Sequence, residues 1–98
     1  MDEKRLKGLL GLCIKSGNAV FGEDGCRRAI SRDECGILLL DGSASDNTRK
    51  RYASQCRGKE VPLFILPEGL MHATTGRECM AMGIRKGSLL EQVTGCLK

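Results

Sequence analysis

The chain has 98 residues, of which 41% are hydrophobic, 29% charged and 3% aromatic, and its formal net charge is +4. This length predicts a single domain over residues 1–98, with a modest core of mainly aliphatic, methionine and cysteine side chains. No apolar run approaches the roughly 20 residues that a membrane-spanning helix needs, and the opening segment lacks the apolar stretch of a signal peptide. We therefore expect a cytoplasmic protein with no membrane partner.

The first 16 residues carry the clearest periodicity, because their apolar side chains recur at intervals of three and four residues. This spacing predicts a helix over residues 2–16, which Gly17 is placed to end. We expect a short extended segment around residues 20–21, and then a second helix over residues 23–31. The remaining elements are expected in this order: a strand at 35–42, a helix over 43–60 capped by Ser45 or Asp46, a strand at 61–67, a short helix over 68–74, a strand at 78–84 and a terminal helix capped by Ser88.

These strands are apolar throughout and alternate with helices, which is typical of a sheet covered on both faces. The predicted fold class is therefore α/β, in the form of a three-layer α/β/α sandwich. No linker, repeat or low-complexity stretch indicates a second domain.

The six cysteines are scattered along the chain without any C-x-x-C pair, and His72 is the one histidine. A zinc site needs closely spaced ligands that converge on one ion, and a disulfide framework is expected mainly in secreted chains. We therefore expect structural thiols, no metal and no cofactor. The cysteine count keeps a thiol-redox or metal protein open as an alternative.

Candidate catalytic groups do not assemble into a set. Asp41 lies at the carboxyl end of a predicted strand, where the active-site groups of α/β proteins often lie. However, His72 has no paired acid or base near it in the sequence. Ser43, Ser45 and Asp46 are typical turn and helix-cap residues. We therefore predict that the protein is not an enzyme and has no catalytic residues.

The segment KSGNAVFGEDGCRRAI, residues 15–30, combines glycines, adjacent acids and adjacent arginines. Gly17 and Gly22 have the spacing of a phosphate-binding loop, but such a loop follows a strand and also needs a lysine and a Ser or Thr. Glu23 and Asp24 stand in those places, and the segment follows a helix. A phosphate-binding loop is therefore rejected.

Two interpretations of this segment stay open. In the first, the acids at a helix start accept hydrogen bonds from base edges, while Arg27 and Arg28 reach phosphates. In the second, Glu23 and Asp24 only favour the helix start, and Asp24 forms an ion pair with Arg28 four residues later.

Arg77 lies in the segment TTGRECM, a small polar loop expected between a helix and a strand. If residues 22–28 and 75–79 adjoin, they form one basic, glycine-lined groove that suits RNA distorted from regular A-form geometry. The basic run that contains Lys50 and Arg51 is instead expected to be a solvated helix face of little importance for binding.

Three segments carry a likeness to a known family: LLGLCIKSGNAVFGEDGCRRAI, ILLLDGSASDNTRKR with its A-S-x-N-T core, and CRGKEVPLFIL. Together they resemble the kink-turn RNA-binding superfamily of small ribosomal proteins, and most closely its bacterial YlxQ-like group of ribosome-associated proteins. The resemblance covers nearly the whole chain. It implies an α/β/α sandwich around a mixed four-stranded sheet. It also implies that the partner is structured RNA, either ribosomal RNA or a kink-turn-containing RNA, with the ribosome or other translation proteins as further partners.

The resemblance also implies which residues contact RNA. In the better-studied members, the loop that opens the second helix reads G-x-N-E, with a Lys three residues further on. Here Gly22 keeps the glycine, Asp24 stands at the Asn position, Gly25 at the Glu position and Arg28 at the Lys position. Asp24 accepts hydrogen bonds but lacks the amide donors, Gly25 has no side chain, and Arg28 preserves the positive charge.

The predicted RNA-binding residues form two lips of one site: Gly22, Asp24, Gly25, Arg27 and Arg28 on the first, and Gly76, Arg77 and Glu78 on the second. The predicted function is that of a non-catalytic RNA-binding protein of the translation apparatus, which recognises kink-turn-like RNA. The missing side chain at Gly25 keeps a second hypothesis open, a protein-interaction module on the same fold with weakened or lost RNA recognition.

Overall fold

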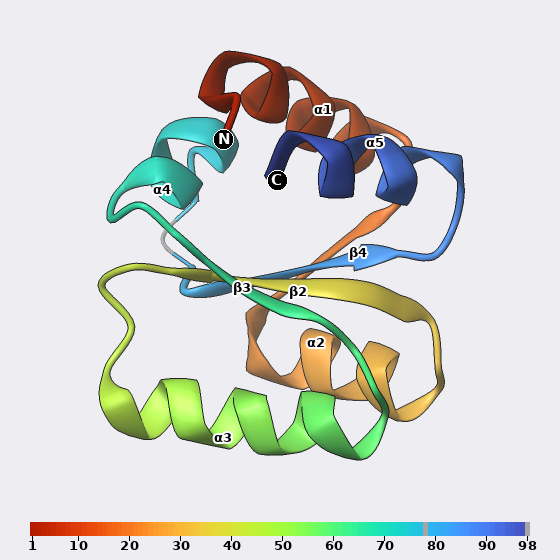
Figure 1. Cartoon of the computed structure of the whole chain (residues 1–98), viewed down its shortest axis with the longest axis vertical. Helices are drawn as coiled ribbons and strands as arrows, with labels where there is room; N and C mark the ends of the chain where they lie inside the picture. The colour runs from red at the N-terminus through yellow and green to blue at the C-terminus, as the bar shows by residue number, and fades with distance from the viewer. Residues whose placement is uncertain (78, 98) are drawn as a thin grey trace.

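The computed structural model describes residues 1–77 and 79–97 of the chain (Figure 1). Helices and strands alternate along it in the order α1 (Glu3–Lys15), β1 (Ala19–Phe21), α2 (Gly22–Ser31), β2 (Cys35–Asp41), α3 (Asp46–Gly58), β3 (Leu63–Leu66), α4 (Leu70–Thr75), β4 (Ala81–Arg85) and α5 (Ser88–Leu97). Each predicted helix and strand is present, with boundaries that shift by a few residues.

The four strands form one mixed sheet in the order β1-β4-β2-β3. Strands β2 and β3 are parallel, whereas β4 is antiparallel to both β1 and β2. Helices α1, α4 and α5 cover one face of the sheet, and α2 and α3 cover the other (Figure 1). The predicted three-layer α/β/α sandwich with a mixed four-stranded sheet is therefore confirmed.

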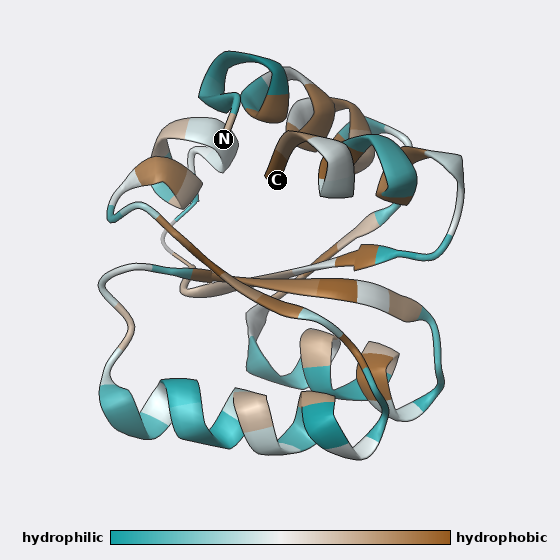
Figure 2. Ribbon diagram, in the orientation of Figure 1, coloured by the Kyte–Doolittle hydropathy of each residue, from teal (hydrophilic) through white to brown (hydrophobic). Residues whose placement is uncertain are grey.

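The position of β2 between the two helix layers explains why its sequence is almost entirely apolar. Ile37 and Leu39 belong to the core beneath α1, α4 and α5, whereas Leu38 and Leu40 belong to the core beneath α2 and α3. Successive side chains of a strand point to opposite faces, so a central strand between two helix layers buries all of them. Figure 2 shows the hydrophobic strands between the layers and the hydrophilic outer surface of α3.

Two helix ends, the start of α3 and the end of α1, follow the predicted chemistry. Ser45 Oγ accepts a hydrogen bond from Thr48 N at 3.2 Å, which identifies Ser45 as the N-cap of α3. Gly17 follows the C-cap of α1 with a φ of 76°, a left-handed conformation that glycine adopts without steric cost. Ser45 therefore caps the start of α3, and Gly17 follows the end of α1, as the sequence predicts.

Several boundaries differ from the prediction. The strand expected at 61–67 is shortened because Pro62 and Pro67, which have no N–H for a ladder, flank it. The strand expected at 78–84 begins at Ala81, where pairing with β2 begins, and pairing with β1 begins one residue later at Met82. Ser88 is the first residue of α5 instead of a cap before it.

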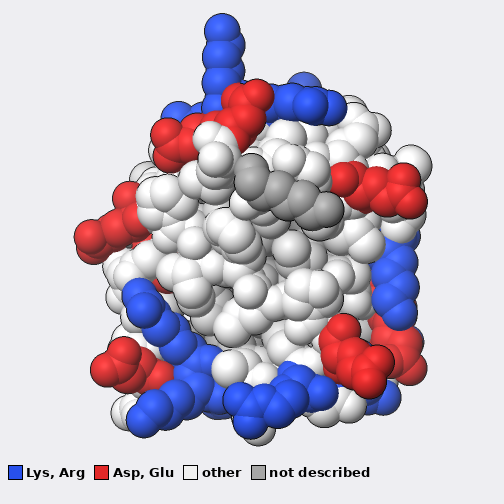
Figure 3. Space-filling view, in the orientation of Figure 1, with Lys and Arg blue, Asp and Glu red and all other residues white. Residues whose placement is uncertain are grey.

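Charged side chains lie mostly around the rim of the face drawn in Figure 3, with Lys and Arg gathered along the edge over α3. The centre of that face carries few charges. Among the described residues, no helix combines the length and apolar character needed to cross a membrane.

Candidate functional site

The first lip of the predicted site is the start of α2. Gly22 has a φ of 78°, which lets the chain turn directly from β1 into the helix. Phe21 occupies the N-cap position in an extended conformation and supplies no side-chain hydrogen bond to the helix. Glu23 and Asp24 then lie in the first turn, where the helix dipole favours negative charge.

The second lip is the loop between α4 and β4, which the structure places against the first. The guanidinium carbon of Arg77 lies 4.6 Å from the centroid of the Phe21 ring, a cation–π contact. Gly76 ends α4 with a φ of 70°, and Arg77 N donates a hydrogen bond to Thr75 Oγ1 at 3.0 Å. The two loops therefore adjoin, as the predicted groove requires. Glu78, also predicted to bind RNA, lies outside the described residues.

In the first lip, the ion pair of Asp24 differs from the expected pair with Arg28. Asp24 Oδ1 instead accepts a hydrogen bond from Arg27 Nη2 at 2.8 Å, three residues away. Residues at both three and four positions lie on the same side of a helix, and here the nearer arginine takes the carboxylate. Arg28 is exposed and lines a shallow hollow with Asp24, Arg27, Ser31 and Arg32.

Gly25 lies in the first turns of α2, where the resemblance implies a Glu. A Cβ built at this position meets no atom within 4 Å, apart from its own helix backbone and chain neighbours. Because its backbone conformation is also ordinary, a larger residue fits there without strain. The structure therefore has room for a glutamate side chain at position 25, although the sequence has glycine there.

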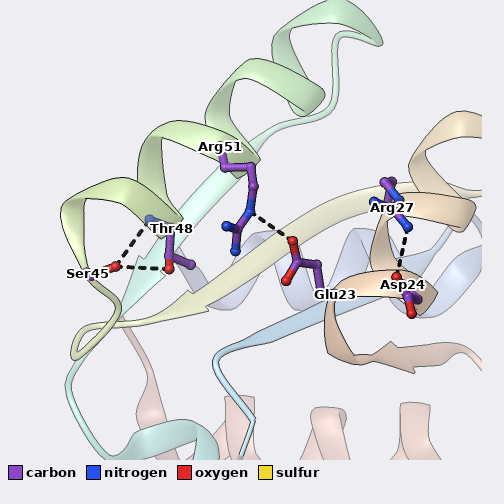
Figure 4. A network of polar contacts seen from close by, with 6 residues as sticks. All are labelled: Glu23, Asp24, Arg27, Ser45, Thr48 and Arg51. Atoms are coloured by element: carbon purple, nitrogen blue, oxygen red, sulfur yellow. Dashed lines mark hydrogen bonds and ion pairs between the residues drawn. The ribbon is translucent and has the colours of Figure 1, made fainter.

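Helix α3 contributes a residue that the sequence reasoning set aside. Arg51 Nε lies 3.0 Å from Glu23 Oε1, and Figure 4 shows Glu23 pointing toward Arg51, whereas Asp24 and Arg27 face each other along α2. Arg51 and Glu23 line the same hollow of about 290 Å³. Lys50 and Arg51 are both exposed, as expected of a solvated face, but Arg51 also forms an ion pair with α2 that the sequence did not predict. Successive side chains of a helix point about 100° apart, so Lys50 and Arg51 point in different directions.

Asp41 holds the turn after β2. It is 5% exposed and accepts hydrogen bonds from Ser43 N at 2.9 Å, from Ser43 Oγ, and from Gly69 N at 3.1 Å. Burial raises the pKa of this carboxyl, but the hydrogen bonds outweigh it and hold the pKa below its ordinary value. The group thereby ties the turn to the start of α4.

Asp41 and the exposed His72 also line a hollow of about 580 Å³ beside the second lip. His72 Nδ1 lies 3.2 Å from Arg77 O, which fixes the loop backbone. The arrangement therefore positions the backbone of Arg77 beside this hollow.

The six cysteines are free, and all except the partly buried Cys79 are buried. Burial raises the pKa of Cys26 to about 12 and that of Cys56 to about 11, so these thiols stay protonated and unreactive near neutral pH. Over residues 1–77 and 79–97, no group of three or more His, Cys, Asp or Glu side chains is placed to hold a metal ion.

Comparison with known proteins adds a sequence relative and a shared fold. No protein-family model matches the chain. A segment of 65 residues is 28% identical to the RNA-binding protein YlxQ of Enterococcus faecium, covering 66% of this chain and 63% of that protein. The match thus spans less than two thirds of the relative's length.

Solved structures share the fold over most of the chain. A protein of unknown function from Bacillus halodurans superposes with a TM-score of 0.87 at 17% identity, covering 95% of this chain and 96% of that one. The Giardia lamblia 15.5 kD RNA-binding protein gives a TM-score of 0.75 at 14% identity, covering 95% and 84%. An archaeal translation termination factor gives 0.62 at 22% identity, covering 80% of this chain and 23% of that one. The predicted resemblance to the YlxQ-like RNA-binding proteins is therefore confirmed, in sequence by the YlxQ relative and in fold by these structures.

Proposed function

We propose that this chain is a non-catalytic RNA-binding protein of the translation or ribosome apparatus, which recognises kink-turn-like RNA through residues 22–28 and 75–79. The observation that carries the proposal is the contact between Arg77 and Phe21 at 4.6 Å, because it joins two loops far apart in the sequence into one surface. The names of the YlxQ relative and of the Giardia lamblia protein, both RNA-binding, support it.

The chemistry of this surface suits distorted RNA better than a regular duplex. Arg28 and Arg77 are exposed guanidinium groups that can contact phosphates or stack on unpaired bases. Asp24 adds an exposed carboxylate, which can accept hydrogen bonds from base edges but repels phosphates. A ligand therefore gains most when it presents base edges and phosphates together, as a kinked RNA does.

The proposal is tested by titrating a fluorescently labelled kink-turn RNA with the protein at low and near-physiological salt. A control RNA has its sheared G·A pairs replaced by Watson–Crick pairs. We expect tighter binding of the kink-turn RNA, with a preference that persists at the higher salt, because base and shape contacts depend less on salt than phosphate contacts do.

Equal binding of both RNAs that disappears at the higher salt would contradict kink-turn recognition and leave a generic basic surface. The absence of binding to either RNA, together with protein purified free of nucleic acid, would favour the alternative of a protein-interaction module. Gly25, which lacks the expected side chain, is the feature that motivates this alternative.

A further inference from the structure

A hollow of about 290 Å³ lies where three separate segments meet, beside the first lip of the site. Glu23 lines it from the start of α2, Thr48 and Arg51 line it from α3, and Met80 lines it from the loop before β4. Its volume is at the lower end of the roughly 300–1,000 Å³ typical of small-ligand pockets, so it suits one planar ring better than a duplex.

The carboxylate of Glu23 is the polar group that faces this hollow from α2. Arg51 Nε holds its Oε1 at 3.0 Å, and both side chains are 47% exposed. This single ion pair leaves acceptor positions free on the two carboxylate oxygens. Met80 is 49% exposed and offers an apolar, polarisable surface for stacking. The hollow therefore combines an oriented acceptor with an apolar wall.

A carboxylate binds best to two adjacent N–H donors that lie in one plane. Among the four RNA bases, guanine alone presents such a pair, its imino and amino groups on the Watson–Crick edge, and it does so when the base is unpaired.

We propose, as an extension that rests on the proposed RNA-binding function, that Glu23 recognises an unpaired guanine seated between α2 and α3. Arg51 is the positioning residue that holds the Glu23 carboxylate in place. The contact lies on a different residue from the Glu position that Gly25 leaves empty, and it draws α3 into the interface.

The test replaces each guanosine of the kink-turn RNA in turn by inosine, which lacks the 2-amino group. With the unaltered protein, one unpaired position should lose about tenfold in affinity, within the range expected for one base contact. With Glu23→Ala, guanosine and inosine at that position should bind equally. Glu91→Ala, on the exposed surface of α5, is the matched control and should keep the tenfold difference.

Each outcome separates this inference from the function on which it rests. Kink-turn binding without any inosine-sensitive unpaired position, or with a difference that Glu23→Ala leaves unchanged, would overturn the role of Glu23 alone. No preference for the kink-turn RNA would overturn both proposals. Unchanged circular dichroism spectra of the variants establish that the fold is intact.

The positioning role of Arg51 has its own readout. Arg51→Ala should reduce the inosine difference to about threefold or less, because the carboxylate loses its fixed orientation, and Arg51→Lys should restore part of it. Lys50→Ala removes the same charge from the adjacent position and should leave the difference unchanged. Equal effects of Arg51→Ala and Lys50→Ala would show that general charge acts here, and would overturn the positioning role.

Discussion

Asp41 and Asp24 place the same chemical group in two opposite settings. Asp41 is 5% exposed and accepts hydrogen bonds from Ser43 and from the backbone of Gly69. The side chain of Asp24 is 81% exposed and has Arg27 as its partner at 2.8 Å. A buried carboxylate with fixed backbone donors stabilises the fold, whereas an exposed one with an exposed partner can exchange that partner for a ligand.

The largest expected effect on stability comes from removing the buried carboxylate of Asp41. Asp41→Ala should lower the free energy of unfolding by about 3 kcal/mol, because the N–H groups of Ser43 and Gly69 lose their acceptor. Urea denaturation measures the change, with Asp46→Ala, in the exposed first turn of α3, as the control. A loss no larger than that of the control would contradict the structural role of Asp41.

The same carboxyl should make stability depend on pH in a predictable direction. Its pKa in the folded protein lies below the ordinary value of 3.8, so the folded state binds its proton more weakly than the unfolded state does. The stability from this group is therefore present above about pH 4 and is lost as the pH falls through the folded pKa. The difference in unfolding free energy between the unaltered protein and Asp41→Asn should shrink below pH 4. A constant difference down to pH 2 would contradict this linkage.

The contrast between these two carboxylates also shows what the sequence could predict. The burial of β2 and the Ser45 cap follow from local patterns, and the structure confirms both. The contact between Arg77 and Phe21 joins residues 56 positions apart. No local pattern predicts such a contact, and the resemblance alone implied that the loops adjoin.

The ion pair between Arg51 and Glu23 was not predicted from the sequence, for a related reason. A run of basic residues on a polar helix reads as a solvated face, since its periodicity shows which side is buried but not what approaches it. Only the packing of α3 beside α2 reveals that Arg51 reaches Glu23. The choice of Arg27 over Arg28 as the partner of Asp24 was likewise undecidable from spacing, because both positions face the acid.

Substitution of an exposed charged residue should weaken RNA binding without lowering the stability of the fold. Arg28→Ala is expected to weaken kink-turn RNA binding about tenfold, since hydrogen bonds to charged groups contribute about 1.5 kcal/mol or more. Fluorescence titration at two salt concentrations measures the loss, and Lys50→Ala serves as the control. Affinities that match the unaltered protein at both salt concentrations would place Arg28 outside the interface.

A smaller effect, in the opposite direction, is expected at Gly25. Gly25→Glu should strengthen kink-turn binding about threefold to fivefold, because it restores the carboxylate that the resemblance implies and the space around the position is open. The helix should also gain up to about 1 kcal/mol from replacing glycine. Gly8→Glu, at an exposed and open position within α1, controls for added charge and helix propensity. An equal change in binding by both variants would remove any specific role for residue 25.

The smallest effect should come from Asp24→Asn, which repeats at the exposed position the substitution proposed for Asp41. Its stability should change by less than about 0.5 kcal/mol, because an exposed ion pair contributes little. Kink-turn affinity should rise by about twofold, since the amide keeps an acceptor, adds donors and removes a negative charge that repels phosphates. Urea denaturation and RNA titration on the same preparations measure both quantities. A loss of stability approaching that of Asp41→Asn would mean that Asp24, like Asp41, stabilises the fold. Exposure of the Asp24 carboxylate would then not be enough to make it available to a ligand.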